Sequence, residues 1–226
     1  MTNFFRRIAL KMGFKKPLVI AIDGPSASGK GTIAKKLAAE FDLPFLNTGA
    51  LYRLVAYRAV LQQIDPSEIN PYLNELTENI SEEALENSAL FDEEVGAVAS
   101  LIAKNPALRS KLFLQQKNFI TKGKKERGGA VLDGRDTTTV ICPDADYKFF
   151  ITASVETRAK RRFTQLQAKG ENVSYEEILA QLTLRDKNDK TRKDSPLLIA
   201  RDAIVIDNSN INAEETFAKA LSFIKK

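Results

Sequence analysis

The sequence of 226 residues contains no histidine, no tryptophan and a single cysteine, Cys142. Histidine is the commonest general base and the commonest metal ligand, so its absence excludes a Ser-His-Asp hydrolase and a His-ligated zinc enzyme. One cysteine cannot form an internal disulfide and is typical of a reducing compartment, so we expect a cytoplasmic protein. No apolar run approaches the length of a transmembrane helix. Any catalysis must therefore use Lys, Arg, Asp, hydroxyl and backbone groups.

An excess of positive charge is confined to one end of the chain. The formal net charge is +5, and residues 1–16 hold five basic side chains and no acid. The remaining 29 basic residues match the 29 acidic ones, so the body of the protein is neutral and we expect no nucleic-acid partner. Apolar residues near helical spacing make 1–16 an amphipathic tail, interpreted as a poorly ordered extension, with a membrane-surface or transit role as the alternative.

A phosphate-binding loop is the most informative motif. It follows the apolar run 18–22 and precedes an amphipathic stretch, the strand–loop–helix context that such a loop requires. Glycines let backbone N–H groups surround a polyphosphate, the helix N-terminus adds partial positive charge, and a lysine reaches the terminal phosphates. The alternative is a Gly-rich turn without a ligand. The expected ATP-binding residues are Gly24, Pro25, Ser26, Ala27, Ser28, Gly29, Lys30, Gly31 and Thr32.

Five short apolar segments alternate with helical patterns along the chain. This order predicts an α/β protein with a three-layer P-loop NTPase fold, in which a five-stranded parallel sheet has helices on both faces. Residues 62–128 contain no strand pattern and read as a helical insert, with a basic loop at 122–129. Ser174 and Glu177 form a capping box for a helix that reaches Arg185 or a little beyond. The expected strands are 18–23, 43–46, 130–132, 147–152 and 203–207.

Charged residues gather where these strands end. Asp133, Arg135 and Asp136 directly follow a buried strand, and ligands of parallel sheets bind at the carboxyl ends of strands. Asp133 could hold Mg²⁺ as a Walker-B carboxylate does, or could cap a turn. Arginines near strand ends suit phosphoryl transfer, whose transition state spreads charge over peripheral oxygens; the alternative is a set of surface ion pairs. If the acceptor is itself a phosphate, its second ionisation lies near pH 6. Its attacking oxygen is then already an anion at neutral pH and needs no general base.

Four separated motifs and one flanking stretch together resemble a bacterial-type cytidylate kinase, of the P-loop nucleoside monophosphate kinase family. The resemblance runs from about Leu18 to the C-terminus. In the family, Gly is usual where Thr138 stands and Ser where Thr48 stands, and the acceptor-side insert often contains a small antiparallel sheet. The motifs are GPSASGKGT at 24–32, NTGALYR at 47–53, LDGRDTTTV at 132–140 and RDKNDKTRKDSPL at 185–197, and the stretch is ETRAKRRFTQLQAKG at 156–170.

The resemblance implies transfer of the γ-phosphate of ATP to CMP or dCMP, with Mg²⁺, in a domain spanning 17–226. Its core is 17–61 and 129–226, its acceptor-binding insert is 62–128 and its lid is about 156–172. The implied catalytic residues are Lys30, Arg135, Arg158, Arg161 and Arg162. The implied acceptor-binding residues are Thr48, Arg53, Ser100, Arg109, Arg135, Asp136, Arg185, Asp189 and Arg192. The implied metal-binding residues are Thr32 and Asp133.

Other functions remain as alternatives. A related P-loop kinase acting on UMP, another nucleotide or a shikimate-like acceptor shares the loop but not the pairing of Asp136 with Ser100 and Arg109. A GTPase requires a guanine-reading NKxD element after a strand, whereas Asn188-Asp189-Lys190 lies at the polar end of a predicted helix. A nucleic-acid-binding module conflicts with the neutral body. We expect a monomer that binds small nucleotides and neither nucleic acid nor membrane.

Overall fold

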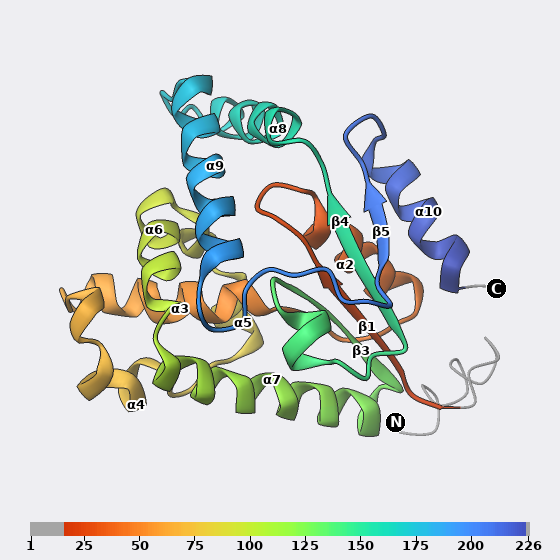
Figure 1. The fold of residues 1–226 in the computed structure, drawn as a ribbon. Coiled ribbons are helices and arrows are strands. Elements are labelled where there is room, and N and C mark those ends of the chain that lie inside the picture. Colours follow the sequence, from red (N-terminus) through yellow and green to blue (C-terminus); the bar gives the residue numbers. More distant parts are fainter. Residues whose placement is uncertain (1–15, 225–226) are drawn as a thin grey trace. The chain divides into compact units, whose positions relative to one another are not determined.

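A five-stranded sheet forms the centre of the computed structural model, which describes residues 16–224 (Figure 1). The strand order is β2-β3-β1-β4-β5, and β1 pairs in parallel with β3 and with β4, as β4 does with β5. The predicted fold class is confirmed. The prediction of strand 43–46 was wrong in its bounds, because β2 spans Phe45–Asn47. The strands are β1 (Leu18–Asp23), β2 (Phe45–Asn47), β3 (Gly129–Gly134), β4 (Tyr147–Thr152) and β5 (Ile204–Asp207).

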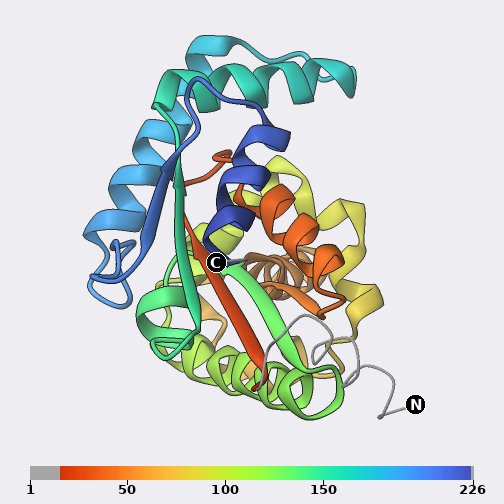
Figure 2. The same ribbon diagram turned by 90° about the vertical axis from the view of Figure 1, so that its right-hand side faces the viewer.

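The core explains why the central strands are apolar throughout. Every residue of β1 is buried, because the strand has neighbours on both edges and packing on both faces. Ile20 and Ile22 join the apolar faces of α2 (Lys30–Glu40) and α10 (Ala213–Ile224) in one cluster. Figures 1 and 2 show α2 and α10 on one side of the sheet and α9 (Tyr175–Thr191) on the other. The phosphate-binding loop therefore leaves the sheet between β3 and β4.

The described chain divides into two compact units. The first ends at Leu46 and resumes at Ile120, and the second is Asn47–Phe119. In the first unit, α8 (Val155–Ala168) and α9 share an apolar cluster. The predicted capping box is confirmed, because Ser174 Oγ accepts from the Glu177 amide and Glu177 Oε2 accepts from the Ser174 amide. α9 is longer than predicted and ends at Thr191. The amphipathic tail predicted for 1–16 lies outside the described residues, apart from Lys16.

The second unit contains helices and turns from Thr48 onward. It begins with α3 (Thr48–Leu61), whose N-terminus is capped by the Asn47 side chain. Short turns and helices cross 66–91: η1 (Pro66–Glu68), η2 (Asn70–Tyr72), α4 (Leu73–Leu76), α5 (Glu82–Glu86) and η3 (Ser88–Phe91). They are followed by α6 (Glu93–Ile102) and by α7 (Pro106–Glu126), which continues into the first unit. Within residues 16–224, no helix has both the length and the apolar composition needed to cross a bilayer.

The loop predicted at 122–129 was wrong, because α7 continues to Glu126. Gly123 suggested a loop, but it is a packing position within the helix. A Cβ on Gly123 would overlap the carbonyl oxygen of Gly129 and would lie 3.2 Å from Pro44. The missing side chain lets the last turns of α7 approach the start of β3. Lys124 and Lys125 in the final turn favour the helix because they face the negative end of its dipole.

Replacement by alanine should destabilise the protein to different extents at Gly129 and at Gly170. A Cβ on Gly129 would overlap the carbonyl oxygen of Leu18, whereas Gly170, which follows α8 with φ +80°, has no atom within 4 Å of the added Cβ. Gly129→Ala should lower the free energy of unfolding by about 3 kcal/mol or more, since backbone must move. Gly170→Ala should lower it by about 1 kcal/mol, the left-handed backbone penalty alone. Urea unfolding of both variants tests this, and equal losses would contradict the packing at Gly129.

Candidate functional site

The loop after β1 presents donors that the described chain does not use. Gly29 precedes α2 in the left-handed conformation, and no side chain caps the helix N-terminus. Ser28 is fully buried, and its hydroxyl has no hydrogen-bond partner among residues 16–224. A long helix leaves its first N–H groups to be satisfied by a cap, water or a ligand. The loop therefore fits a bound phosphate chain, which would accept from these groups.

Lys30 and Asp133 place opposite charges beside this loop. Lys30 Nζ donates to the Pro25 carbonyl at 3.3 Å. Burial lowers the pKa of Lys30, and the positive charge of Arg135 lowers it further, against the attraction of Asp133. Burial likewise raises the pKa of Asp133, opposed by the charges of Lys30 and Arg135. An ideal Cβ on Gly31 would lie 3.3 Å from Asp133 Oδ2, so this carboxylate lies against the first turn of α2.

A second group of charges joins β3 to α9. Arg135 Nε donates to Asp189 Oδ2 at 2.8 Å. Burial raises the pKa of Asp189, but the charges of Arg135 and Arg185 outweigh burial and leave that pKa below its usual value. Burial also lowers the pKa of Arg185 to about 10, and the charge of Arg135 adds to the effect. Arg185 Nε has no hydrogen-bond partner in the described part of the chain. Arg185 therefore remains cationic at neutral pH with a donor to offer an anion.

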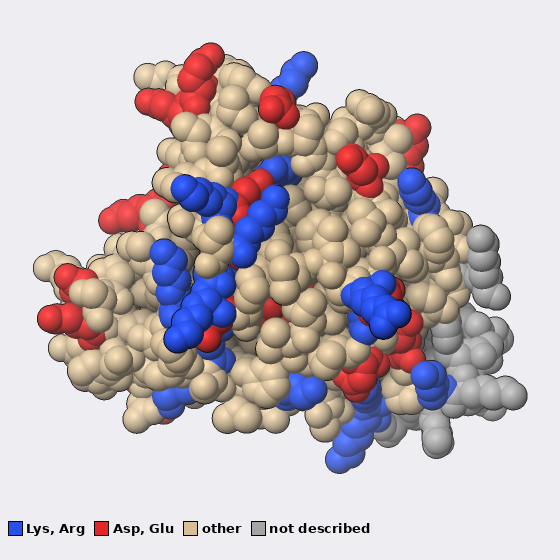
Figure 3. Space-filling view, viewed as in Figure 1, with Lys and Arg blue, Asp and Glu red and all other residues tan. Residues whose placement is uncertain are grey.

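Further basic side chains of this unit lie on α8, on α9 and in the segment after α9. In Figure 3, blue side chains follow the position of α9 and are interleaved with acidic ones. The charge of Arg162 on α8 lowers the pKa of Arg185, and the charge of Arg192 lowers the pKa of Asp189. Because Arg185 and Asp189 also interact with each other, both arginines act on one cluster of charges. Arg192 Nε donates to the Ser195 carbonyl at 2.6 Å just beyond α9. These two arginines that act on Arg185 and Asp189 thus come from α8, which carries Arg162, and from the residue directly after α9, which is Arg192.

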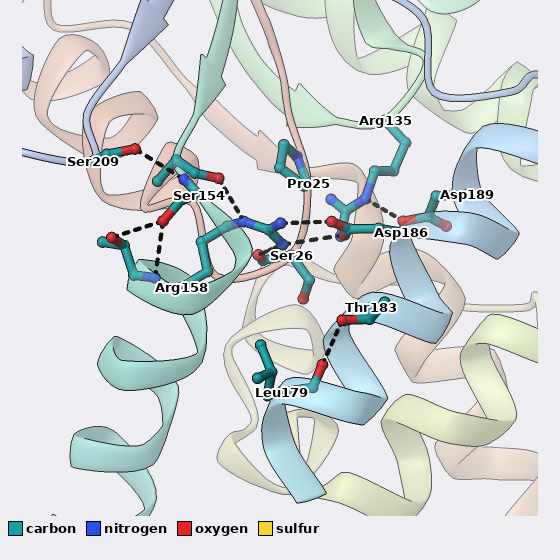
Figure 4. A network of polar contacts seen from close by, with 12 residues as sticks. Pro25, Ser26, Arg135, Ser154, Arg158, Leu179, Thr183, Asp186, Asp189 and Ser209 are labelled. Atoms are coloured by element: carbon teal, nitrogen blue, oxygen red, sulfur yellow. Dashed lines mark hydrogen bonds and ion pairs between the residues drawn. The ribbon is translucent and has the colours of Figure 1, made fainter. Parts of the chain in front are cut away.

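The three arginines of α8 that are predicted to belong to a lid differ in their contacts. Arg158 is only 3% exposed, pairs with Asp186 and also donates to the Ser26 and Ala153 carbonyls (Figure 4). Arg161 donates to the side chain of Asn208 at 2.9 Å and to its carbonyl at 2.7 Å. Arg162 donates to the Gln165 side chain on its own helix at 3.1 Å. Arg158 and Arg161 therefore bond to residues outside α8, whereas the Gln165 partner of Arg162 lies on the same helix.

A buried carboxylate organises the segment that contains Asp136. Asp23 ends β1 and accepts three hydrogen bonds: from the Thr137 amide at 2.9 Å, the Thr138 amide at 2.7 Å and the Thr138 hydroxyl at 2.6 Å. Burial raises the pKa of Asp23, and these three donors act against that rise. Thr137–Ile141 forms a π-helical turn (η4), a rare conformation that is frequent at functional sites. The Thr138 side chain thus fastens the turn after Asp136 to the strand that carries the phosphate-binding loop.

The second unit holds the other four predicted acceptor residues. Arg53 Nη1 donates to the Leu90 carbonyl at 2.6 Å, and its guanidinium lies over the Phe91 ring. An ideal Cβ on Gly96 would lie 2.9 Å from Arg53 Nη2, so Gly96 leaves space for this arginine. Ser100 donates to the Gly96 carbonyl at 3.0 Å, one turn before it on α6. Arg109 lies over the Tyr52 ring, and Thr48 is buried at the start of α3.

The predicted magnesium ligands fit only part of a metal site. Asp133 is buried next to Lys30, and Thr32 is exposed in the first turn of α2. Within residues 16–224 no three acidic, cysteine or histidine side chains group as metal ligands. A carboxylate beside a phosphate-binding loop nevertheless suits a cation whose other ligands are phosphate and water. The role of Thr32 and Asp133 stays a prediction.

Three residues without a role in the sequence analysis join the segments of this site. Asp186 forms an ion pair with Arg158. Asn208 donates to the Ser28 carbonyl at 2.9 Å, and Asp23 accepts from the first amide of η4. Asp186 could have been noticed because it follows Arg185 within a recognised motif. Asn208 directly follows β5, where the parallel-sheet rule places ligand contacts. Their partners are 28 and 180 residues away in the chain, so no local pattern identifies the contacts.

Comparisons with known proteins identify one family. The sequence model of the cytidylate kinase family matches residues 20–226. The chain is 48% identical to a protein named cytidylate kinase from Bartonella tribocorum over 212 residues, covering 92% of this chain and 95% of that protein. It is 42% identical to a cytidylate kinase from Acidiphilium cryptum over 211 residues, covering 93% and 97%.

Two solved structures support the fold alone, because the sequence identities are low. A crystal structure of an uncharacterised protein from Eubacterium ventriosum has a TM-score of 0.53 at 17% identity and covers 92% of this chain and 99% of that one. The structure of TT1252 from Thermus thermophilus has a TM-score of 0.51 at 20% identity and covers 93% and 97%. Both likenesses extend over nearly the full length of each chain.

The bond from Thr138 to Asp23 predicts a measurable loss of stability. Thr138→Val keeps the shape of the side chain but removes the donor to a buried carboxylate, which should lower the free energy of unfolding by about 1–3 kcal/mol. Thr138→Ser keeps the hydroxyl and should lose about 1 kcal/mol or less. Urea denaturation of both variants is the measurement. If valine proved as stable as serine at this position, the hydroxyl would have no structural role.

Proposed function

The chain belongs to the cytidylate kinase family, and on this premise we propose that it transfers the γ-phosphate of ATP to CMP or dCMP, giving ADP and CDP or dCDP. The observation that carries the proposal is the cationic group at the carboxyl ends of β1 and β3. Lys30, Arg135 and Arg185 lie within electrostatic reach of one another, next to a loop with unused donors. Such a group stabilises an anion on which negative charge develops.

The donor side is proposed to be the loop 24–32 with Lys30 and the lid arginines. The amides at the start of α2 and the hydroxyl of Ser28 would donate hydrogen bonds to the phosphate oxygens of ATP. Mg²⁺, held through Thr32 and Asp133, would neutralise charge on the transferred group. Lys30 would regain its full charge there, because a polyphosphate favours the protonated amine that burial disfavours.

The acceptor side is proposed from the residues that the family resemblance implies. Arg53, Arg135 and Arg192 would hold the CMP phosphate, whose second ionisation near pH 6 makes its oxygen an anion at neutral pH. That oxygen attacks the γ-phosphorus, the bond from γ-phosphorus to the β,γ-bridging oxygen breaks, and ADP leaves with the electron pair. The nucleophile needs no general base, in keeping with a chain without histidine. Ser100, Arg109 and Asp136 would read the cytosine edge, with Thr48 beside the acceptor, and Arg185 and Asp189 would contact the ribose.

An ADP-release assay across CMP, dCMP, UMP, AMP and GMP tests the proposed reaction. We expect turnover with CMP and dCMP that requires Mg²⁺ and is abolished by a chelator. Lys30→Met should reduce turnover by about two to three orders of magnitude, because it removes a charge that acts on the transferred phosphate. Lys190→Met, which changes an exposed lysine near the end of α9, is the matched control. Activity confined to AMP or GMP would refute the assignment of the base.

Gly96 supplies a test of the acceptor side alone. Gly96→Ala should place a methyl group against the Arg53 guanidinium and displace it. Because Arg53 is proposed to bind the CMP phosphate, the KM for CMP should rise several-fold while the KM for ATP stays within about twofold. Alanine should also stabilise the interior of α6 by roughly 0.5–1 kcal/mol. Steady-state kinetics and thermal melts measure both effects, and an unchanged KM for CMP would argue against this role of Arg53.

A further inference from the structure

Asp186 and Arg158 form a buried ion pair between α8 and α9. Arg158 Nη1 donates to Asp186 Oδ1 at 3.1 Å and Nη2 donates to Oδ2 at 2.5 Å, a two-point contact of planar groups. The side chains are 4% and 15% exposed. Figure 4 shows the guanidinium pointing from α8 towards the Asp186 carboxylate on α9. The shielding from solvent makes this contact more restrictive than a surface ion pair.

The same guanidinium reaches the phosphate-binding loop. Arg158 Nη1 also donates to the Ser26 carbonyl at 3.1 Å, and Nε donates to the Ala153 carbonyl at 2.9 Å (Figure 4). One side chain therefore connects the loop, the junction of β4 with α8, and α9. These contacts use Nε and both terminal nitrogens of Arg158. These contacts indicate that Arg158 holds the loop in place. This role is separate from the contact with ATP that the family resemblance implies for Arg158.

The tip of the loop has a second contact with the helix pair. Ala27, next to Ser26, has φ 59°, a left-handed conformation that is unfavourable for a residue with a Cβ. Its side chain packs against the apolar cluster of Ala159, Leu166, Ile178 and Leu182 from α8 and α9. The surrounding contacts hold this unfavourable backbone in place, as is frequent at functional sites. The loop conformation therefore depends on where α8 and α9 lie.

α9 carries a second anchor one turn further along. Asp189 lies three residues after Asp186, and so on the same side of the helix, and pairs with Arg135 at the end of β3. Arg185 precedes Asp186 directly. A shift of α9 would thus change the loop through Arg158 and the cationic group through Arg135 and Arg185. Figure 4 shows the two carboxylates of α9 directed at two different arginines.

We propose that Asp186 is a positioning residue for phosphoryl transfer: through Arg158 it holds the Ser26 carbonyl, and with it the loop that receives the phosphates of ATP. This inference rests on the proposed function for its ligand. Without the Asp186 charge, the buried guanidinium loses its anionic partner and is no longer oriented towards Ser26. ATP must then order the loop amides when it binds. The free energy used for this ordering is lost from the binding free energy, so ATP is bound more weakly.

The test compares Asp186→Asn with Glu176→Gln, which also changes a carboxylate to an amide on α9 but at an exposed position without a cap role. We expect Asp186→Asn to raise the dissociation constant for ATP about tenfold in isothermal titration calorimetry. Its KM for ATP should rise in parallel, whereas the KM for CMP should change less. Glu176→Gln should leave all three constants within twofold. A residue with only a structural role would lower the melting temperature without changing the ATP affinity of the folded protein.

Arg158→Lys and the double variant separate the pair from other effects. If Asp186 acts through Arg158, the double variant should bind ATP about as weakly as the weaker single variant, and the two effects should not multiply. Should Asp186→Asn fail to fold, Asp186→Glu keeps the charge and should retain most of the ATP affinity, while Arg158→Lys should lose it. Unchanged ATP affinity in folded Asp186→Asn, multiplying effects, or weak binding by Asp186→Glu comparable to that of Arg158→Lys would each overturn the inference.

The failures of the two proposals are distinguishable. A wild-type protein that binds ATP without phosphorylating CMP would refute the proposed reaction, while the ATP titrations would still decide the role of Asp186. A wild-type enzyme active on CMP whose Asp186→Asn variant binds ATP normally would refute the inference alone. A wild-type protein without ATP affinity would refute both.

Discussion

The concentration of like charge at one edge of a buried sheet is the constraint on which the rest of the first unit depends. The charge of Arg135 lowers the pKa of both Lys30 and Arg185, and the charge of Arg185 also lowers that of Lys30, because positive charges held out of water repel one another. The folded chain compensates with Asp133 and Asp189, which lie among these cations. The compensation is partial, and the remaining positive charge is what an anionic nucleotide would neutralise.

The carboxylates of this region have distinct tasks because their surroundings differ. Asp23 accepts hydrogen bonds from neutral donors only, in the contacts described, and orders a turn of the backbone. Asp186 and Asp189 face guanidinium groups and connect α9 to two other segments. Asp133 lies beside an amine and the first turn of α2. Each carboxylate is buried or nearly so, which makes the identity of its partner decisive for the local structure.

Thr138 shows how a departure from the family pattern is accommodated. The family usually has Gly at this position, and a β-branched residue restricts the backbone there. The structure places the Thr138 hydroxyl 2.6 Å from Asp23, so the side chain adds a donor to a carboxylate that already binds two amides. The residue therefore strengthens the connection between β1 and η4.

The sequence by itself determined the fold class, the Gly-rich loop between β1 and α2, and the capped start of α9. These features have local signals: apolar runs for β1 and β4, the capping box at Ser174, and a Gly-rich loop between a strand and a helix. Only the tertiary structure decided that Arg158 is buried against Asp186, that Asn208 contacts Ser28, and that Gly123 lies inside α7. Those facts depend on contacts between residues far apart in the chain or on the close approach of two backbones. A glycine or a charged residue has the same local appearance in sequence whether its partner is solvent or a distant segment, and packing makes the difference.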